Sequence, residues 1–285
     1  MKRLLTLLVT AILAVTAVMG LTACNKDELA MGKEMIKADS QLDAVIKLDN
    51  GTVDAVVIDS IMAGYYAAKG DYAGKIAIVP NLTLAQEEYG IAGRKDDKAF
   101  MSKINEALIA LNETKVIDTT ATLFGVKDSL AIKSDATDPY KNATDGSWDA
   151  IIDSGKIVIG YTLFAPIAYK EGELLTGFDI ELARQVTTYL NLKYSADLEV
   201  EFLLINWDSK EAMLEEGSID LVWNGMTITP EREEAMCISI PYLYNKQVAV
   251  VKTEELANYT DKASFSDAVI AVEKGSAGES VVSGK

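Results

Sequence analysis

The chain has 285 residues, a formal net charge of −16 and no histidine. The absence of histidine excludes a Ser-His-Asp triad, a Cys-His pair and any zinc site with histidine ligands. The acidity argues against binding to nucleic acids or to anionic lipid surfaces, because both need basic patches. A site for an ion with oxygen ligands stays open, but no calcium-loop spacing stands out. We therefore expect neither a metal nor a cofactor.

The N-terminus has the order of a secretory signal: a short basic segment, an apolar run over 4–20, and then "LTAC" ending at Cys24. This ending resembles the lipobox of bacterial lipoproteins, which implies a signal peptide over 1–23 and a lipid on Cys24. The alternative is an uncleaved membrane anchor, since the run is nearly long enough to span a bilayer. Both place the bulk of the protein outside the cytoplasm. Cys237 then remains as a single thiol, so we expect no disulfide within the chain.

Helix and strand signals alternate along the rest of the chain, which is typical of an α/β protein. After a polar spacer, the apolar spacing predicts helices and strands in this order: a helix over 40–49, a strand over 53–58, a helix over 59–69, a strand over 75–79, and helices over 100–111 and 116–125. The segment 128–147 is polar and contains Pro139 and several turn formers, so it is predicted to be a linker. The alternation then restarts with a strand over 156–160, a helix capped by Asp179, a strand over 200–205, a helix over 208–216 and a strand over 219–223.

Two stretches have the pattern of a binding site. In "DLVWNGMTITPER", a strand is followed by Thr227, by an N-cap and proline at Thr229 and Pro230, and by Arg232 one turn later. Threonine hydroxyls, backbone N–H groups and a guanidinium together suit a carboxylate. The alternative is a capped surface helix with a solvated arginine. Near the C-terminus, a strand over 269–272 leads into a small-residue turn and a helix start, a common place to hold an anion.

The order of these motifs adds a resemblance. The segments "IGYTLFAPIAY", "GFDIELARQV" and "INWDSKEAMLEEGSIDLVWNGMTITPEREEAMCISIPYLYNKQVAVV" resemble the N-terminal half of polar-amino-acid solute-binding proteins, the extracytoplasmic receptors of ABC importers. The segments "DAVIKLDNGTVDAVVIDSIMAGYYAAK" and "EEYGIAGRKDDKAFMSKINEALIAL" resemble the C-terminal half of the same family. The resemblance implies a two-lobed α/β fold of the type II periplasmic-binding-protein kind, with a hinge of two crossing strands.

The two halves stand in reversed order, and each family element occurs once. We therefore predict a circular permutation, which chains tolerate when their ends lie close together at a surface; a truncated tandem receptor is the alternative. The predicted parts are a signal peptide over 1–23, a lipid anchor and spacer over 24–40, a first lobe over 87–244 that contains the linker 128–147, and a second lobe split into 25–86 and 245–285. The hinge would cross near 85–87 and 244–246.

The resemblance also implies ligand contacts. Arg232 would grip the α-carboxylate, helped by Thr227 and by the turn at Ser276 and Ala277. The Gly225 carbonyl and the Asp59 carboxylate would hold the α-ammonium. Phe164 and Trp207 would sandwich the ligand side chain, and Trp223 would pack behind the site. Plainer readings are open for several of these residues: Asp59 as a helix N-cap, and the aromatic rings as ordinary core.

Tyr161 falls where several relatives place an aspartate that holds a basic or amide side chain. This departure favours a neutral amino acid, aromatic or mid-sized, as the ligand. The resemblance implies a monomeric, lipid-anchored receptor that works with an ABC permease in the membrane and has no enzymatic activity. The alternatives are a ligand-binding sensor or adhesin without transport, and a dehydratase-like enzyme on the same fold with Asp59 or Glu273 as its acid or base.

Overall fold

A computed structural model describes residues 29–285, so the predicted signal peptide and Cys24 lie outside the described residues. The helices are α1 (Gln41–Asp49), α2 (Ser60–Ala68), α3 (Lys98–Glu113), α4 (Val116–Phe124), α5 (Ser147–Ser154), α6 (Phe178–Tyr194), α7 (Lys210–Glu215), α8 (Pro230–Ala235) and α9 (Ala277–Ser283). The strands are β1 (Glu34–Ala38), β2 (Ala55–Asp59), β3 (Ile76–Arg94), β4 (Lys156–Tyr161), β5 (Tyr169–Glu171), β6 (Leu174–Thr176), β7 (Glu199–Leu204), β8 (Leu221–Thr227), β9 (Met236–Ile238), β10 (Leu243–Lys252) and β11 (Val269–Glu273). Within the described range, the helices are too short or too polar to cross a membrane.

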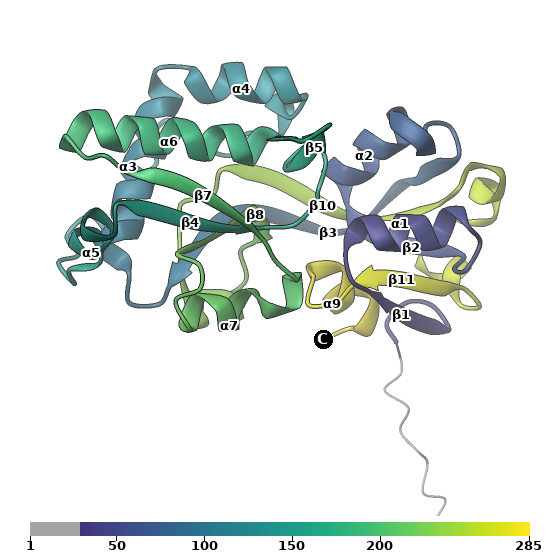
Figure 1. The fold of residues 1–285 in the computed structure, drawn as a ribbon. Helices are drawn as coiled ribbons and strands as arrows, with labels where there is room; N and C mark the ends of the chain where they lie inside the picture. The colour runs from purple at the N-terminus through teal and green to yellow at the C-terminus, as the bar shows by residue number, and fades with distance from the viewer. Residues whose placement is uncertain (1–28) are drawn as a thin grey trace, which may run out of the picture.

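One mixed sheet runs through the molecule in the order β1-β11-β2-β10-β3-β8-β4-β7, with β9 paired to β3. Figure 1 shows two groups of elements joined by the long strands β3 and β10. We call the group with β4, β7 and β8 the first lobe, and the group with β1, β2 and β11 the second lobe. The α/β class predicted from the alternating pattern is confirmed. The antiparallel pair β3 and β10 passes from one lobe to the other around Gln86 and Lys246, which lie opposite each other.

The second lobe is a three-layer unit because β2 is apolar on both faces. Val56 and Ile58 belong to the core under α1 and α2, whereas Ala55 and Val57 belong to the core under α9. This alternation follows from the two-residue period of a strand. The carboxyl ends of the parallel strands β1, β11 and β2 therefore meet at one edge, where Asp59 ends β2.

The first lobe repeats this arrangement around β8. Leu221 and Trp223 face the core formed with α3, α4 and α6, while Val222 and Met226 face the core formed with α7. In Figure 1, α4 and α6 lie above this part of the sheet and α7 lies below it. The strand β8 is thus buried on both faces along its length and carries its last residue, Thr227, to the boundary between the lobes.

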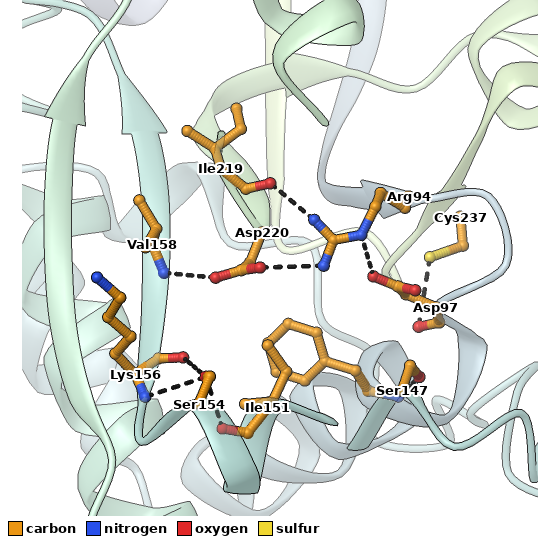
Figure 2. Close-up of polar contacts among 11 residues, drawn as sticks. Arg94, Asp97, Ser147, Ile151, Ser154, Lys156, Val158, Ile219, Asp220 and Cys237 are labelled. Atoms are coloured by element: carbon orange, nitrogen blue, oxygen red, sulfur yellow. Dashed lines mark hydrogen bonds and ion pairs between the residues drawn. The ribbon is translucent and has the colours of Figure 1, made fainter. Parts of the chain in front are cut away.

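A cluster of paired charges fixes the start of β8 (Figure 2). Arg94 donates to the Ile219 carbonyl at 2.9 Å and to Asp220 at 3.0 Å, and its Nε lies 2.7 Å from Asp97. Asp220 also accepts a hydrogen bond from the backbone N–H of Val158, at 2.9 Å. The cluster therefore links β3, β4 and β8 at the end of the first lobe far from β10.

Most predicted elements are present, with three differences. The strand predicted over 75–79 continues to Arg94, because its residues pair first with β10 and then with β8 and β9. Asp179 is not the N-cap of α6; the cap is Gly177, and Asp179 lies inside the helix with its side chain buried. The predicted linker is a path of turns that is fixed to α3 by hydrogen bonds from Ser102 and Asn105 to Asp138.

Candidate functional site

A narrow cavity lies between the two lobes. It holds about 340 Å³ of space not filled by atoms, part of it open to solvent. The first lobe contributes Thr162, Leu163, Phe164, Trp207, Asn224, Gly225, Thr227 and Arg232 to its lining, and the second lobe and the hinge strand β10 contribute Gln41, Asp59, Gln247, Glu273, Ser276 and Ala277. Asp59 and Glu273 end the parallel strands β2 and β11, and Gln41, Ser276 and Ala277 lie in the helix starts that follow such strand ends. This is the edge at which open α/β sheets bind ligands.

Asp59 is a buried carboxylate surrounded by neutral donors. Its Oδ1 accepts from the Tyr89 hydroxyl at 2.7 Å, from Gln247 at 2.8 Å and from Asn245. Its Oδ2 accepts from Gln41. Burial, and next the nearby Glu87, raise the pKa of Asp59 to about 7. Asp59 stands at the N-cap position of α2, but its side chain makes no capping hydrogen bond to the helix and is directed to the donors of the cavity instead.

Glu273 is the second buried carboxylate of the cavity. Glu273 is the last residue of β11, the strand next to β2, and it is 4% exposed. Burial, followed by the repulsion of Asp59, raises the pKa of Glu273 to about 8. Two carboxyl groups thus lie side by side at this sheet edge, where each disfavours the ionisation of the other.

Arg232 lies on the opposite wall. The helix that carries it, α8, begins as predicted: Pro230 lies in its first turn, and the Thr229 hydroxyl accepts a hydrogen bond from the Arg232 backbone N–H at 3.3 Å. The guanidinium donates to the carbonyls of Thr227 at 2.8 Å and of Gly275 at 3.2 Å. It forms no ion pair with any residue in the described range 29–285. Burial lowers the pKa of Arg232 below its ordinary value.

Lys210 provides a second buried cation beside Arg232. Its ammonium donates to the carbonyls of Trp207 at 3.2 Å and of Gly275 at 3.4 Å, and lies 4.9 Å from the centre of the Trp207 ring. Burial, and next the nearby Arg232, lower the pKa of Lys210 to about 8. The Gly275 carbonyl of the second lobe therefore accepts from two cations of the first lobe. An exposed ion pair between Lys274 and Asp208, at 2.7 Å, adds a further contact across the cavity.

The backbone of β8 bends at Gly225, where φ is +64°. A Cβ atom there would lie 2.7 Å from the Phe164 ring and 2.9 Å from the Tyr89 ring, so both the backbone angle and the close rings require glycine. Its N–H donates to the Asp179 carboxylate at 3.0 Å. Asp179 therefore fixes this bend from behind the cavity.

The structure brings together eight of the nine predicted contact residues: Asp59, Phe164, Trp207, Gly225, Thr227, Arg232, Ser276 and Ala277 all line the cavity. Tyr161 is the exception. Its ring packs with Ala168 and Ile180 and meets the Phe202 ring edge to face, so it lies outside the lining. Trp223 is buried behind the site, as expected, against Tyr242.

Sequence reasoning missed several lining residues, namely Gln41, Thr162, Leu163, Asn224 and Gln247. For one of them, Gln247, the sequence contains a signal. Asn245 and Gln247 occupy alternate buried positions of β10, and buried amides need partners. The amide Gln41 follows the N-cap Ser40 of α1, and nothing in the local pattern marks it.

The fold and the cavity define a class: mixed α/β proteins of two lobes with a cleft between them, the type II periplasmic-binding-protein fold. Residues 157–277 match the sequence profile of the bacterial extracellular solute-binding proteins, family 3.

Individual relatives match over shorter shares of their length. A probable ABC transporter extracellular-binding protein, YckB, of Bacillus subtilis (strain 168) is 31% identical over 41% of this chain and 40% of its own. The arginine-binding extracellular protein ArtP of the same strain is 33% identical over 38% and 42%. A substrate-binding protein of an ABC uptake transporter from Streptococcus pneumoniae, solved with bound histidine, is 34% identical over 31% and 34%, with a TM-score of 0.27. The chain thus spans about two fifths of the length of the curated relatives it matches.

Proposed function

We propose that the chain is the substrate-binding lipoprotein of an ABC importer and captures one free amino acid in the cleft between its lobes. The observation that carries this proposal is the separation of unpaired charges. Arg232 on one wall has carbonyl partners and no ion pair with any described residue, while Asp59 on the other has neutral donors. A zwitterion fits between them, because its carboxylate and ammonium supply the two missing counter-charges.

In this proposal the ligand carboxylate replaces the Gly275 carbonyl as a partner of Arg232 and also accepts from the Thr227 hydroxyl and N–H. The ammonium lies between Asp59 and the Gly225 carbonyl. Phe164 and Trp207 enclose the ligand side chain. Closing the lobes removes these charges from water and strengthens their pairing, and the closed form is the one a permease would recognise.

The relatives support an amino acid as the ligand. Their names assign arginine, cystine and histidine to individual proteins of the family. They are mainly binding proteins, and we propose binding without turnover for this chain as well.

A thermal-shift screen of the full chain, purified in a mild detergent, against the twenty amino acids tests the proposal. A ligand at 100 times its dissociation constant adds about 2.7 kcal/mol to the free energy of unfolding. One or a few amino acids should raise the melting temperature by several degrees and be recovered unchanged. A protein that melts cooperatively and responds to none of them would contradict the proposal.

We also propose that the chain is circularly permuted relative to its relatives. Strands from the two ends of the described range pair in parallel, β1 with β11, and the backbone N–H of Ala30 donates to the Val282 carbonyl at 2.9 Å. A rearranged chain, with residues 148–285 joined through a short linker to 29–127, should therefore fold and bind the same amino acid. Failure of this chain to fold would contradict the permutation and leave the cleft unaffected.

Attachment to the membrane by a lipid on Cys24 is a further part of the proposal. Cells expressing the chain should incorporate radiolabelled palmitate into it, and Cys24→Ser should abolish both the label and membrane retention. Label on the Cys24→Ser variant would contradict this assignment. On gel filtration we expect one chain per particle.

A further inference from the structure

Two buried oxygen atoms in the cleft have no hydrogen-bond partner among the residues that the structure describes. They are Oε1 of Glu273 and Oε1 of Gln247. Both residues line the cavity, and they are 4% and 1% exposed. A buried oxygen without a donor is unfavourable, because it has lost its hydrogen bonds to water. Both atoms are acceptors on the same wall, so this wall is suited to a molecule that brings additional N–H groups.

The α-ammonium of an amino acid does not account for both oxygens. Asp59 accepts three hydrogen bonds at Oδ1 and one at Oδ2, so Oδ2 keeps a position for the ammonium. Glu273 lies on the neighbouring strand and keeps its unpartnered oxygen when that position is filled.

The buried cations of the protein do not supply the missing donor either. Lys210 gives its hydrogen bonds to the carbonyls of Trp207 and Gly275, and its only ion pair within the described residues, at 3.9 Å, is with Glu211. Arg232 is held by two other carbonyls. Glu273 is therefore left without a cation at ion-pair distance inside the described protein.

A ligand with an apolar side chain leaves the unpartnered oxygens of Glu273 and Gln247 without donors. A side chain that ends in an ammonium or a guanidinium brings several N–H groups and a positive charge to this wall.

We propose that Glu273, together with Gln247, binds a positively charged side-chain group of the ligand, so that the ligands are cationic amino acids such as arginine, lysine and ornithine. This inference rests on the proposed function and replaces the neutral ligand expected from Tyr161, whose ring lies outside the cavity. A cation beside Glu273 also offsets the burial that raises its pKa to about 8, because it favours the ionised carboxylate.

Titration calorimetry on the full chain in detergent tests the proposal with two pairs of ligands of nearly equal shape: arginine against citrulline, and lysine against norleucine. Wild-type protein should bind each cationic member at least about tenfold more tightly than its neutral partner. Glu273→Gln keeps the size of the side chain and removes its charge, so it should reduce this preference to about threefold or less. Glu254→Gln, an exposed glutamate in the turn after β10, is the matched control and should keep the preference.

Equal affinity of wild-type protein for arginine and citrulline would overturn the proposal, as would a preference that survives in folded Glu273→Gln protein. In both cases the amino-acid site itself stands, since binding is still observed. Equal affinity is also the result expected if one α-ammonium bridges Asp59 and Glu273. If Glu273→Gln does not melt cooperatively, the comparison of arginine with citrulline on wild-type protein decides alone. Binding of no amino acid at all would instead remove the proposed function and this inference together.

Discussion

Two arginines of the first lobe lie in opposite electrostatic surroundings. Arg94 meets Asp97 and Asp220 in the cluster of Figure 2, and although burial opposes its charge, these two carboxylates raise its pKa above the ordinary value. Arg232 is also partly buried, but its partners are carbonyl groups, and burial lowers its pKa. The same side chain is thus neutralised within the protein in one place and left without a counter-ion in the other.

This difference separates a structural charge from a ligand-binding charge. A paired, partly buried ion group links strands and needs nothing from outside. A buried charge without a counter-ion is costly unless a partner arrives. The cleft has groups without a counter-ion on both walls, the guanidinium of Arg232 on one and the carboxyl groups of Asp59 and Glu273 on the other. We therefore assign ligand binding to the cleft and not to the Arg94 cluster.

Among the substitutions, Arg232→Ala is expected to have the largest effect, a loss of ligand affinity. In the proposed complex this change leaves a buried ligand carboxylate without its partner, which costs about 2–5 kcal/mol, or roughly 30- to 4,000-fold in affinity. Calorimetry with the amino acid that gives the largest thermal shift measures it. Unchanged affinity would remove Arg232 from the site.

Arg94→Ala should show the reverse behaviour. It leaves Asp97 and Asp220 facing each other without a cation and should lower the free energy of unfolding by about 1–3 kcal/mol, as measured in urea. The affinity of the folded variant should stay within about twofold of wild type, since Arg94 lies far from the cleft lining. A large loss of ligand affinity in fully folded Arg94→Ala protein would contradict the distinction between the two arginines.

The third effect is the pH dependence of stability without ligand. Burial raises the pKa values of Asp59, Asp179 and Glu273 in the folded protein to about 7, 7 and 8, from ordinary values of 3.8, 3.8 and 4.5. Between these limits the folded state binds more protons at these three groups than the unfolded state does. Their contribution to stability is therefore fully present below about pH 4 and is lost as the pH rises toward 8. The contribution of other groups, such as the paired carboxylates, runs the opposite way.

Melting temperatures of wild-type and Glu273→Gln protein from pH 5 to pH 8 isolate this contribution, because the other groups are common to both. The variant should lose less stability over this range than wild type. Parallel curves would show that Glu273 ionises as freely in the folded protein as in the unfolded chain.

The smallest effect is expected from Lys274→Ala. Its ion pair with Asp208 crosses the cleft, but both side chains are about half exposed, and exposed pairs contribute little. We expect the unfolding free energy in urea to stay the same within error, and the ligand affinity to change by less than about threefold. A loss as large as that of Arg232→Ala would mean that this surface pair, and not the buried charges, holds the lobes together around the ligand.

The sequence was sufficient where local patterns determine structure. The alternation of apolar residues predicted β2, β8 and α6, and the Thr229-Pro230 pair predicted the start of α8. It was insufficient for β3, because the second half of this strand pairs with β8 and β9, which lie more than 120 residues away in the chain. Long-range pairing leaves no short-range signal.

The same division holds for the cleft. The resemblance to solute-binding proteins led to Arg232, Asp59, Phe164 and Trp207, all of which line the cavity. Tyr161 was misplaced because strand alternation turns its ring toward Phe202, away from the cleft. The roles of Gln41 and Gln247 as donors to Asp59 depend on strands and helices that meet only in the folded protein.

The most direct test of the account is a crystal structure of the protein with the amino acid that raises its melting temperature most. We predict that the ligand lies between the lobes, with its carboxylate bound by Arg232 and Thr227 and its α-ammonium bound by Asp59. The guanidinium of Arg232 should have exchanged the Gly275 carbonyl for the ligand. A ligand bound elsewhere, or bound in the cleft without contact to Arg232 and Asp59, would contradict the claim that these unpaired charges form the binding site.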